Sequence, residues 1–244
     1  MKKGALLIIC ACILLPAAVR PAHAQAAAEL KAFQDAAGER SVLFRGKQAA
    51  RYVFPANGHP YWVYPDFERG DITFEGNFYH DVPINVDAVV QRALVQLEGR
   101  PVAVALVPAL TPSFTMGSRR FAGLGAGGPL PEGFYEILGR GAHQVYKHVS
   151  KYVVNSPVNA NGDGIGYYDE YYRADLPRHF AYRAAYYYLN ADGSFSRIRN
   201  RRALLRKFPD RKREIRRALQ ARGLLDPDSD FDEFCETVLE LAGS

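Results

Sequence analysis

The segment AHQVYKHVSKYVV, residues Ala142–Val154, carries the clearest secondary-structure pattern of the chain. Its even-numbered positions include Tyr146, Tyr152 and Val154, and its odd-numbered positions alternate valine with lysine. Successive side chains of a strand point to opposite faces, so apolar residues would occur on both faces. This pattern predicts a long strand within a curved sheet or beside packed helices. The odd-numbered series is Val145, Lys147, Val149, Lys151 and Val153.

The strand pattern begins at about Val42, in short aromatic and β-branched runs separated by Gly, Pro, Asn and Asp. Gly76-Asn77 and Gly99-Arg100 have the composition of hairpin turns, so we expect antiparallel pairing around them. The predicted strands before the central segment are Arg51–Phe54, Tyr61–Tyr64, Asp71–Glu75, Phe78–His80, Ala93–Glu98, Val102–Val107, Phe114–Met116 and Phe134–Leu138.

The strand pattern resumes after a loop rich in Gly and Asn, residues 155–166. His179–Leu189 predicts a strand that ends at Asp192-Gly193, and Ser194–Arg199 predicts its hairpin partner. We therefore expect a β-rich domain over residues 42–199.

The last 45 residues change to helical spacing. Asp210 is a candidate N-cap for a helix over Arg211–Arg222, with Gly223 as its C′ residue. Ser229 or Asp230 begins a second helix with an apolar stripe, which predicts a packed amphipathic helix. The expected fold class is thus α+β: a twisted antiparallel β-sheet or partial barrel, followed by a C-terminal helical segment, residues 200–244, packed on it. The stripe is Phe231, Phe234, Cys235, Val238 and Leu239.

The N-terminal residues have the composition of an export signal. A basic start precedes the apolar run Ala5–Leu15, which is too short to span a bilayer as a helix. Ala22-His23-Ala24 provides a small-x-small cleavage pattern. We expect a signal peptide over residues 1–24, cleavage near Ala24-Gln25, a short leader or helix over residues 25–41, and a periplasmic or secreted mature protein.

Cleavage would change the charge and cysteine content. The chain has 31 Lys and Arg against 26 Asp and Glu, and the signal peptide contains Lys2, Lys3 and Arg20, so 28 basic residues would remain. Of the three cysteines only Cys235 would remain, which excludes an internal disulfide. Because no second run approaches the length of a membrane span, we expect a mature chain without a transmembrane span.

Several fragments rich in Gly and aromatic residues extend over much of residues 42–220. They are GDITFEGNFYHDVPI (Gly70–Ile84), GFYEIL (Gly133–Leu138) with Gly141, YYL (Tyr187–Leu189) with Gly193, Arg201-Arg202, and FPD (Phe208–Asp210). In these fragments the chain resembles an uncharacterised family of secreted or periplasmic proteins of Bacteroidota. The resemblance implies an extracytoplasmic β-rich protein with helices at its end, and it implies no activity.

The loop after the central strand contains a candidate metal site. Asn159, Asn161 and Asp163 lie at positions 1, 3 and 5 of a twelve-residue series, with Gly164 at 6 and Glu170 at 12. This is the oxygen spacing of a calcium loop, so Ca²⁺ is the one candidate cofactor. Three features depart from that motif: Asn replaces the usual Asp at position 1, the hydrophobic residue Ile165 lies at position 7 and not at position 8, and strand-like segments flank the loop. The alternative interpretation is a plain Asn/Gly/Asp turn.

Charge is segregated near the C-terminus. Residues 226–240 hold seven acidic side chains and no basic one, whereas residues 197–222 are strongly basic. Two interpretations remain open: the basic and acidic helices pack together, or the basic segment contacts an envelope component or anionic surface. Export argues against nucleic acid as its partner. The basic residues are Arg197, Arg199, Arg201, Arg202, Arg206, Lys207, Arg211, Lys212, Arg213, Arg216, Arg217 and Arg222.

The sequence contains no recognisable catalytic motif. There is no G-x-S-x-G sequence, and His143 and His148 would lie on opposite faces of a strand. Cys235 belongs to an apolar stripe, which predicts a buried thiol. The tyrosine-rich stretch 167–188 would either line a sugar-binding surface or pack within the sheet.

We therefore expect an exported, soluble protein that acts as a non-catalytic binding or envelope-associated module. Two alternatives are an exported hydrolase and a carrier of an apolar ligand in a concave sheet.

Overall fold

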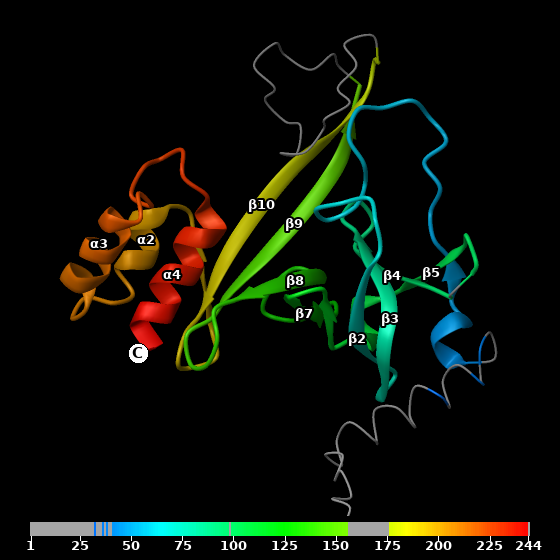
Figure 1. Cartoon of the computed structure of the whole chain (residues 1–244), viewed down its shortest axis with the longest axis horizontal. Coiled ribbons are helices and arrows are strands. Elements are labelled where there is room, and N and C mark those ends of the chain that lie inside the picture. The colour runs from blue at the N-terminus through cyan, green and yellow to red at the C-terminus, as the bar shows by residue number, and fades with distance from the viewer. Residues whose placement is uncertain are drawn as a thin grey trace, which may run out of the picture.

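The fold is a large antiparallel sheet with a group of helices at its C-terminal end (Figure 1). The computed structural model describes residues 41–97, 99–155 and 176–243, together with Ala32, Ala36 and Gly38. Eleven strands form one sheet, and this confirms the β-rich α+β class. The expected signal peptide, most of the leader over residues 25–41, and the candidate calcium residues Asn159, Asn161, Asp163 and Glu170 lie outside the described residues.

The elements have the following bounds. The strands are β1 (Lys47–Gln48), β2 (Glu68–Phe74), β3 (Asn77–Asp87), β4 (Arg92–Gln96), β5 (Ala103–Leu106), β6 (Ser113–Met116), β7 (Arg119–Leu124), β8 (Gly133–Leu138), β9 (Val145–Val154), β10 (His179–Leu189) and β11 (Phe195–Ile198). The helices are the 3-10 turns η2 (Val42–Phe44) and η3 (Pro108–Leu110), and α2 (Arg201–Leu205), α3 (Lys212–Ala221) and α4 (Phe231–Gly243).

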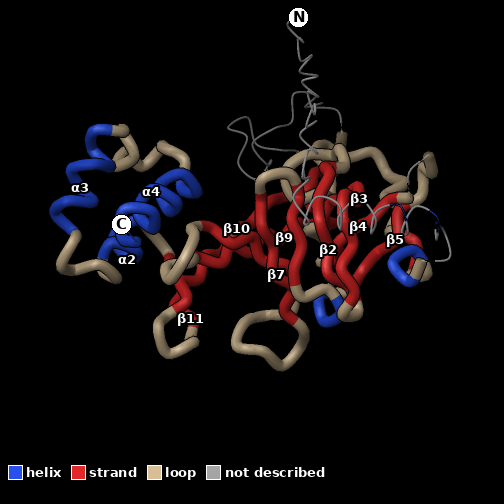
Figure 2. Tube along the Cα trace, turned by 60° about the horizontal axis from the view of Figure 1, so that its bottom comes forward, coloured by secondary structure: helices blue, strands red, loops and turns tan. Residues whose placement is uncertain are grey.

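Most strands of the sheet pair with the strand that precedes or follows them in the sequence. Its order is β1-β5-β4-β3-β2-β6-β7-β8-β9-β10-β11, and every pair is antiparallel. The long β9–β10 pair separates the helices from the strands β2–β5, as Figures 1 and 2 show. In this arrangement α4 lies beside β8, β9 and β10.

Most predicted strands are confirmed, and His179–Leu189 has the predicted limits. The first hairpin turn is formed by Glu75 and Gly76, at φ 48° and 77°, one residue before the predicted Gly76-Asn77. Two predicted strands are wrong: within the described residues, Arg51–Phe54 and Tyr61–Tyr64 belong to an irregular segment. Their aromatic residues are explained by packing, because Trp62 is 1% exposed in the core.

The C-terminal helices agree in part with the prediction. Arg211, and not Asp210, occupies the N-cap position of α3. At its other end Gly223 has φ 72° and its N–H donates to Gln220 O, as expected of a C′ glycine. Asp230 caps α4, because its Oδ1 accepts the backbone N–H groups of residues 232 and 233.

Two hydrophobic clusters stabilise the two ends of the structure. The first packs between the strands β2–β9 and includes Trp62, Phe121 and Phe134. In the second, α2–α4 cover the end of the sheet that carries Leu138 and Val145. The four predicted stripe positions Phe234, Cys235, Val238 and Leu239 are buried in it, and Phe231 packs against it.

Gly70 lies where the β2–β3 register shifts, and β2 approaches β6 closely there. A Cβ atom at Gly70 would lie 1.9 Å from the carbonyl oxygen of Thr115. We expect Gly70→Ala to lower the free energy of unfolding by about 1–3 kcal/mol, because the strands must separate to accommodate the methyl group. Gly128→Ala is the control, since its nearest neighbour would lie 3.5 Å away. Equal urea midpoints for the two variants would contradict this packing.

Candidate functional site

A cavity of about 1060 Å³ lies between the two hydrophobic clusters. It touches Trp62 and Val149 of the first cluster, and Leu138 and Leu239 of the second. Its walls come from the segment 58–64, β7, β8, β9, β10 and α4. Segments far apart in the sequence therefore meet around one space, whose volume is close to the upper limit for small-molecule sites.

Strand register determines which side chains face the cavity. Lys147 pairs with Glu136 of β8 on one side and with Tyr186 of β10 on the other. Directly opposed residues of antiparallel strands project from the same face, at Cβ separations of roughly 4.5–5.5 Å. The cavity floor is therefore a row of a carboxylate, an ammonium and a phenol across three adjacent strands.

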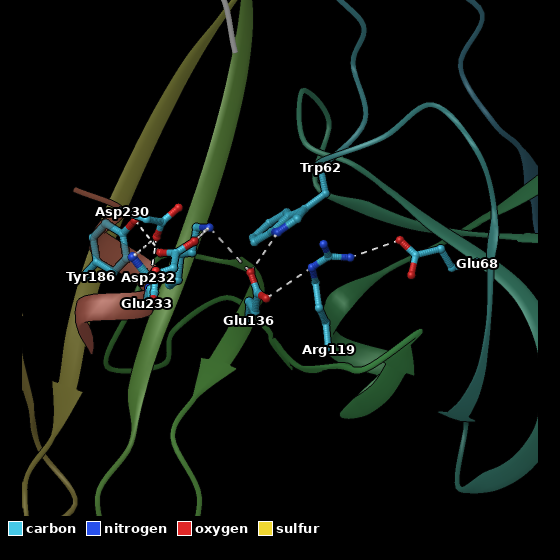
Figure 3. Close-up of polar contacts among 9 residues, drawn as sticks. Trp62, Glu68, Arg119, Glu136, Tyr186, Asp230, Asp232 and Glu233 are labelled. Carbon is cyan, nitrogen blue, oxygen red and sulfur yellow. Dashed lines mark hydrogen bonds and ion pairs between the residues drawn. The ribbon is translucent and has the colours of Figure 1, made fainter. Parts of the chain in front are cut away.

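A chain of ion pairs runs along this floor (Figure 3). Arg119 Nη1 lies 3.0 Å from Glu68 Oε1, and its Nε lies 3.6 Å from Glu136 Oε1. The other oxygen of Glu136 lies 3.6 Å from Lys147 Nζ, and Lys147 also pairs with Asp232 of α4. The chain thus joins β2, β7, β8 and β9 to the first turn of α4.

Two hydrogen bonds complete the network. Trp62 Nε1 donates to Glu136 Oε2 at 3.2 Å, and the Tyr186 hydroxyl donates to Asp232 Oδ1 at 2.8 Å. Further along β9, Lys151 Nζ donates to the carbonyl oxygen of His59 at 3.0 Å. These bonds are needed because charged groups removed from water must find partners.

Burial shifts the pKa values of the network. Glu136 is 7% and Lys147 6% exposed. Burial raises the pKa of Glu136, although Lys147, Trp62 and Arg119 act against this shift. Burial alone would lower the pKa of Lys147, but the surrounding acidic groups, Asp232 first, raise it overall, so Lys147 stays protonated. Burial and Asp232 also raise the pKa of Tyr186, which keeps this phenol a donor.

The tyrosine-rich stretch contributes to the cavity only in part. Tyr182 and Tyr186 line it, whereas Tyr187 packs its ring 6.2 Å from that of Tyr135. The tyrosines at 167, 168, 171 and 172 lie outside the described residues.

The other candidate residues lie apart from the network. His143 Nδ1 and Tyr188 Oη are 2.9 Å apart, whereas the ring of His148 lies tilted against that of Tyr135, with ring centroids 4.8 Å apart. Burial lowers the pKa of His148. Cys235 is fully buried as predicted, and burial raises the pKa of its thiol, which makes it a poor nucleophile. Within the described residues, no group of His, Cys, Asp and Glu has the arrangement of a metal site.

The basic segment contacts the acidic helix α4 through both α2 and α3, but few of their charges pair. Arg222 lies 3.9 Å from Glu240, and Arg211 pairs with Glu214 of its own helix. Arg201 stacks on Phe231 and donates to backbone carbonyls before α4. Pairing between the two helices therefore neutralises only a small part of the basic segment.

Sequence analysis missed the residues of the network, namely Trp62, Arg119, Glu136 and Asp232. One signal was present, because Lys147 and Lys151 interrupt the valine face of the central strand. Lysines on an apolar face require anionic or carbonyl partners, but the sequence does not show which segments supply them.

Comparison with protein-family models, with curated proteins and with solved structures finds no match to this chain. In the part of the chain that the structure describes, none of the helices has the length and apolar character needed to cross a membrane.

The raised pKa of Glu136 predicts a pH dependence of stability. Between the usual carboxyl pKa and this raised value, the folded state binds more protons than the unfolded state, so the free energy of unfolding falls as pH rises. Glu136→Gln removes this titration. We therefore expect E136Q to gain stability relative to the wild type as pH rises from about 4 toward 7, measured by urea unfolding.

The exposed carboxylate of Glu214 provides a control of opposite sign. Its hydrogen bond to Arg211 lowers its pKa, so Glu214→Gln should lose stability relative to the wild type as pH rises. A stability difference for E136Q that stays constant or shrinks with pH would contradict the burial of Glu136.

Proposed function

We propose that this chain is an exported, non-catalytic binding module that holds a small ligand in the cavity between the sheet and α4. The observation that carries the proposal is the cavity itself, about 1060 Å³ in volume and bordered by both hydrophobic clusters. Small-molecule sites are concave spaces of about this size that combine apolar walls with a few polar groups, and this space has both.

The charges of the floor support binding rather than catalysis. Glu136, Lys147 and Asp232 are paired with one another, and these pairs hold the strands and α4 in place. A group that donates or accepts protons in catalysis must also reach the substrate. Pairing within the network leaves these three groups a positioning role.

Three expectations from the sequence belong to this function: export, a curved sheet and a basic surface that contacts an anionic partner. Removal of residues 1–24 would release the protein into the periplasm or the medium, as the resemblance to secreted proteins of Bacteroidota also suggests. A twisted sheet or partial barrel would curve its strands around the ligand. The exposed arginines among residues 197–222 would contact an anionic envelope surface at low ionic strength.

An exported hydrolase is the second candidate, and one observation favours it. Burial raises the pKa of Glu136 beside the cavity, as in carboxyl groups that act as general acids. A carrier of a purely apolar ligand fits less well, because acidic and basic side chains line the same space.

The chain has one tryptophan, Trp62, and it lines the cavity, so its fluorescence reports on ligand binding. We expect neutral fragments that shift Trp62 fluorescence to bind Ser118→Tyr about tenfold more weakly than the wild type, a change of about 1.4 kcal/mol. Ser118 is exposed at the cavity wall, so the added ring narrows the space.

Ser113→Tyr is the matched control, because Ser113 is exposed on β6 and does not line the cavity. Equal affinities in S118Y and S113Y, or a library with no fragment that binds, would overturn the proposed function.

A further inference from the structure

Three acidic residues on one face of α4 line the cavity. Asp232, Glu236 and Glu240 are spaced by four residues, so they follow one another along the helix. Like charges at this spacing destabilise a helix, and cations relieve the repulsion. Lys147 pairs with Asp232, and Arg222 lies 3.9 Å from Glu240. Glu236, the middle residue, has no ion pair among the described residues.

The surroundings of Glu236 favour a cationic group. Glu236 is exposed at the cavity wall. Partial shielding from water and the carboxylates of Glu136, Asp232 and Asp230 raise its pKa, and Lys147 acts against this shift, so three acidic groups and one basic group act on this position. Tyr182 and Tyr186 line the same cavity, and their rings can attract a cation through their faces. An ammonium group in this position would pair with the carboxylate of Glu236 and contact the aromatic rings of Tyr182 and Tyr186.

Basic side chains line the same cavity from other elements. Arg120 of β7 donates to the carbonyl oxygen of Gly139, and its side chain projects from the face of β7 opposite to that of Arg119. Arg140, two residues after the end of β8, is exposed and has no ion pair within the described part of the chain. The guanidinium of Arg140 has the planar donor geometry that binds carboxylate or phosphate oxygens.

We propose that the ligand of this cavity is a small zwitterion, with its ammonium at Glu236 and its anionic group at Arg140. This inference rests on the proposed function and specifies its ligand class. The cavity lining contains side chains of both signs, and within the described part of the chain neither Glu236 nor Arg140 has an ion pair, so a dipolar ligand matches these two groups better than an ion of one sign. An ammonium joined to an anionic oxygen group occurs in short peptides and in aminoalkyl phosphates.

Four forms of the tripeptide Ala-Phe-Ala test the inference through Trp62 fluorescence and calorimetry. They are the free peptide, the N-acetyl form, the C-terminal amide and the doubly blocked form. We expect the free peptide to bind about 10–100 times more tightly than the doubly blocked form, since charge-assisted bonds supply the difference. Glycerophosphoethanolamine replaces the peptide in a parallel titration and distinguishes phosphate from carboxylate as the preferred anion.

Two conservative variants assign the ends of the ligand. Glu236→Gln should weaken the free peptide about tenfold and leave the N-acetyl form unchanged, because only the free peptide carries the ammonium. Arg140→Gln should weaken the free peptide similarly and leave the C-terminal amide unchanged. Glu233→Gln and Arg213→Gln, at exposed positions that do not line the cavity, are the matched controls and should change neither affinity.

The outcomes separate this inference from the proposed function. Equal binding of the free and doubly blocked peptides would overturn the zwitterion, as would neutral fragments that bind while every charged probe fails. Both results leave the cavity as a binding site. If neither fragments nor charged probes bind, the proposed function is wrong and the inference with it.

Discussion

The ion pairs of Lys147 hold the sheet and the C-terminal helices in one arrangement. Its ammonium lies between Glu136 of β8 and Asp232 of α4, and it is 6% exposed. A buried charge that loses a partner destabilises a protein by several kcal/mol, roughly 3–5 in measured cases, so this geometry is strongly constrained. Pairing with both carboxylates requires β8, β9 and the first turn of α4 to approach one another, and the cavity is the space that this arrangement encloses.

The same interaction explains why the two hydrophobic clusters remain separate. Side chains from the sheet fill one cluster, and α2–α4 fill the other against Leu138 and Val145. Between them the inward positions of β8 and β9 are charged, so apolar packing cannot continue across the floor. A polar cavity results, with aromatic rings on β10 and carboxylates on α4 around it. These properties suit a small polar ligand better than a lipid-like one.

Local patterns predicted much of this fold and little of the site. The alternation of residues 142–154 and the apolar stripe of the last helix depend on nearby residues only, so β9 and α4 were predictable. The strands β1 and β7 and the helix α2 were missed. Arg51–Phe54 was wrongly predicted as a strand because its aromatic residues pack against Phe180 from an irregular segment. The row of Glu136, Lys147 and Tyr186 depends on strand register and on the docking of α4, which no local pattern contains.

A double-mutant cycle between Lys147→Met and Asp232→Asn, measured by urea unfolding, tests this account most directly. We expect a coupling free energy of at least about 1 kcal/mol, because Lys147 is buried and the pair joins two parts of the fold. The exposed pair of Arg211 and Glu214 provides the reference cycle, and its coupling should be clearly smaller. A Lys147–Asp232 coupling no larger than that of the exposed pair would contradict the claim that this interaction holds the helices to the sheet.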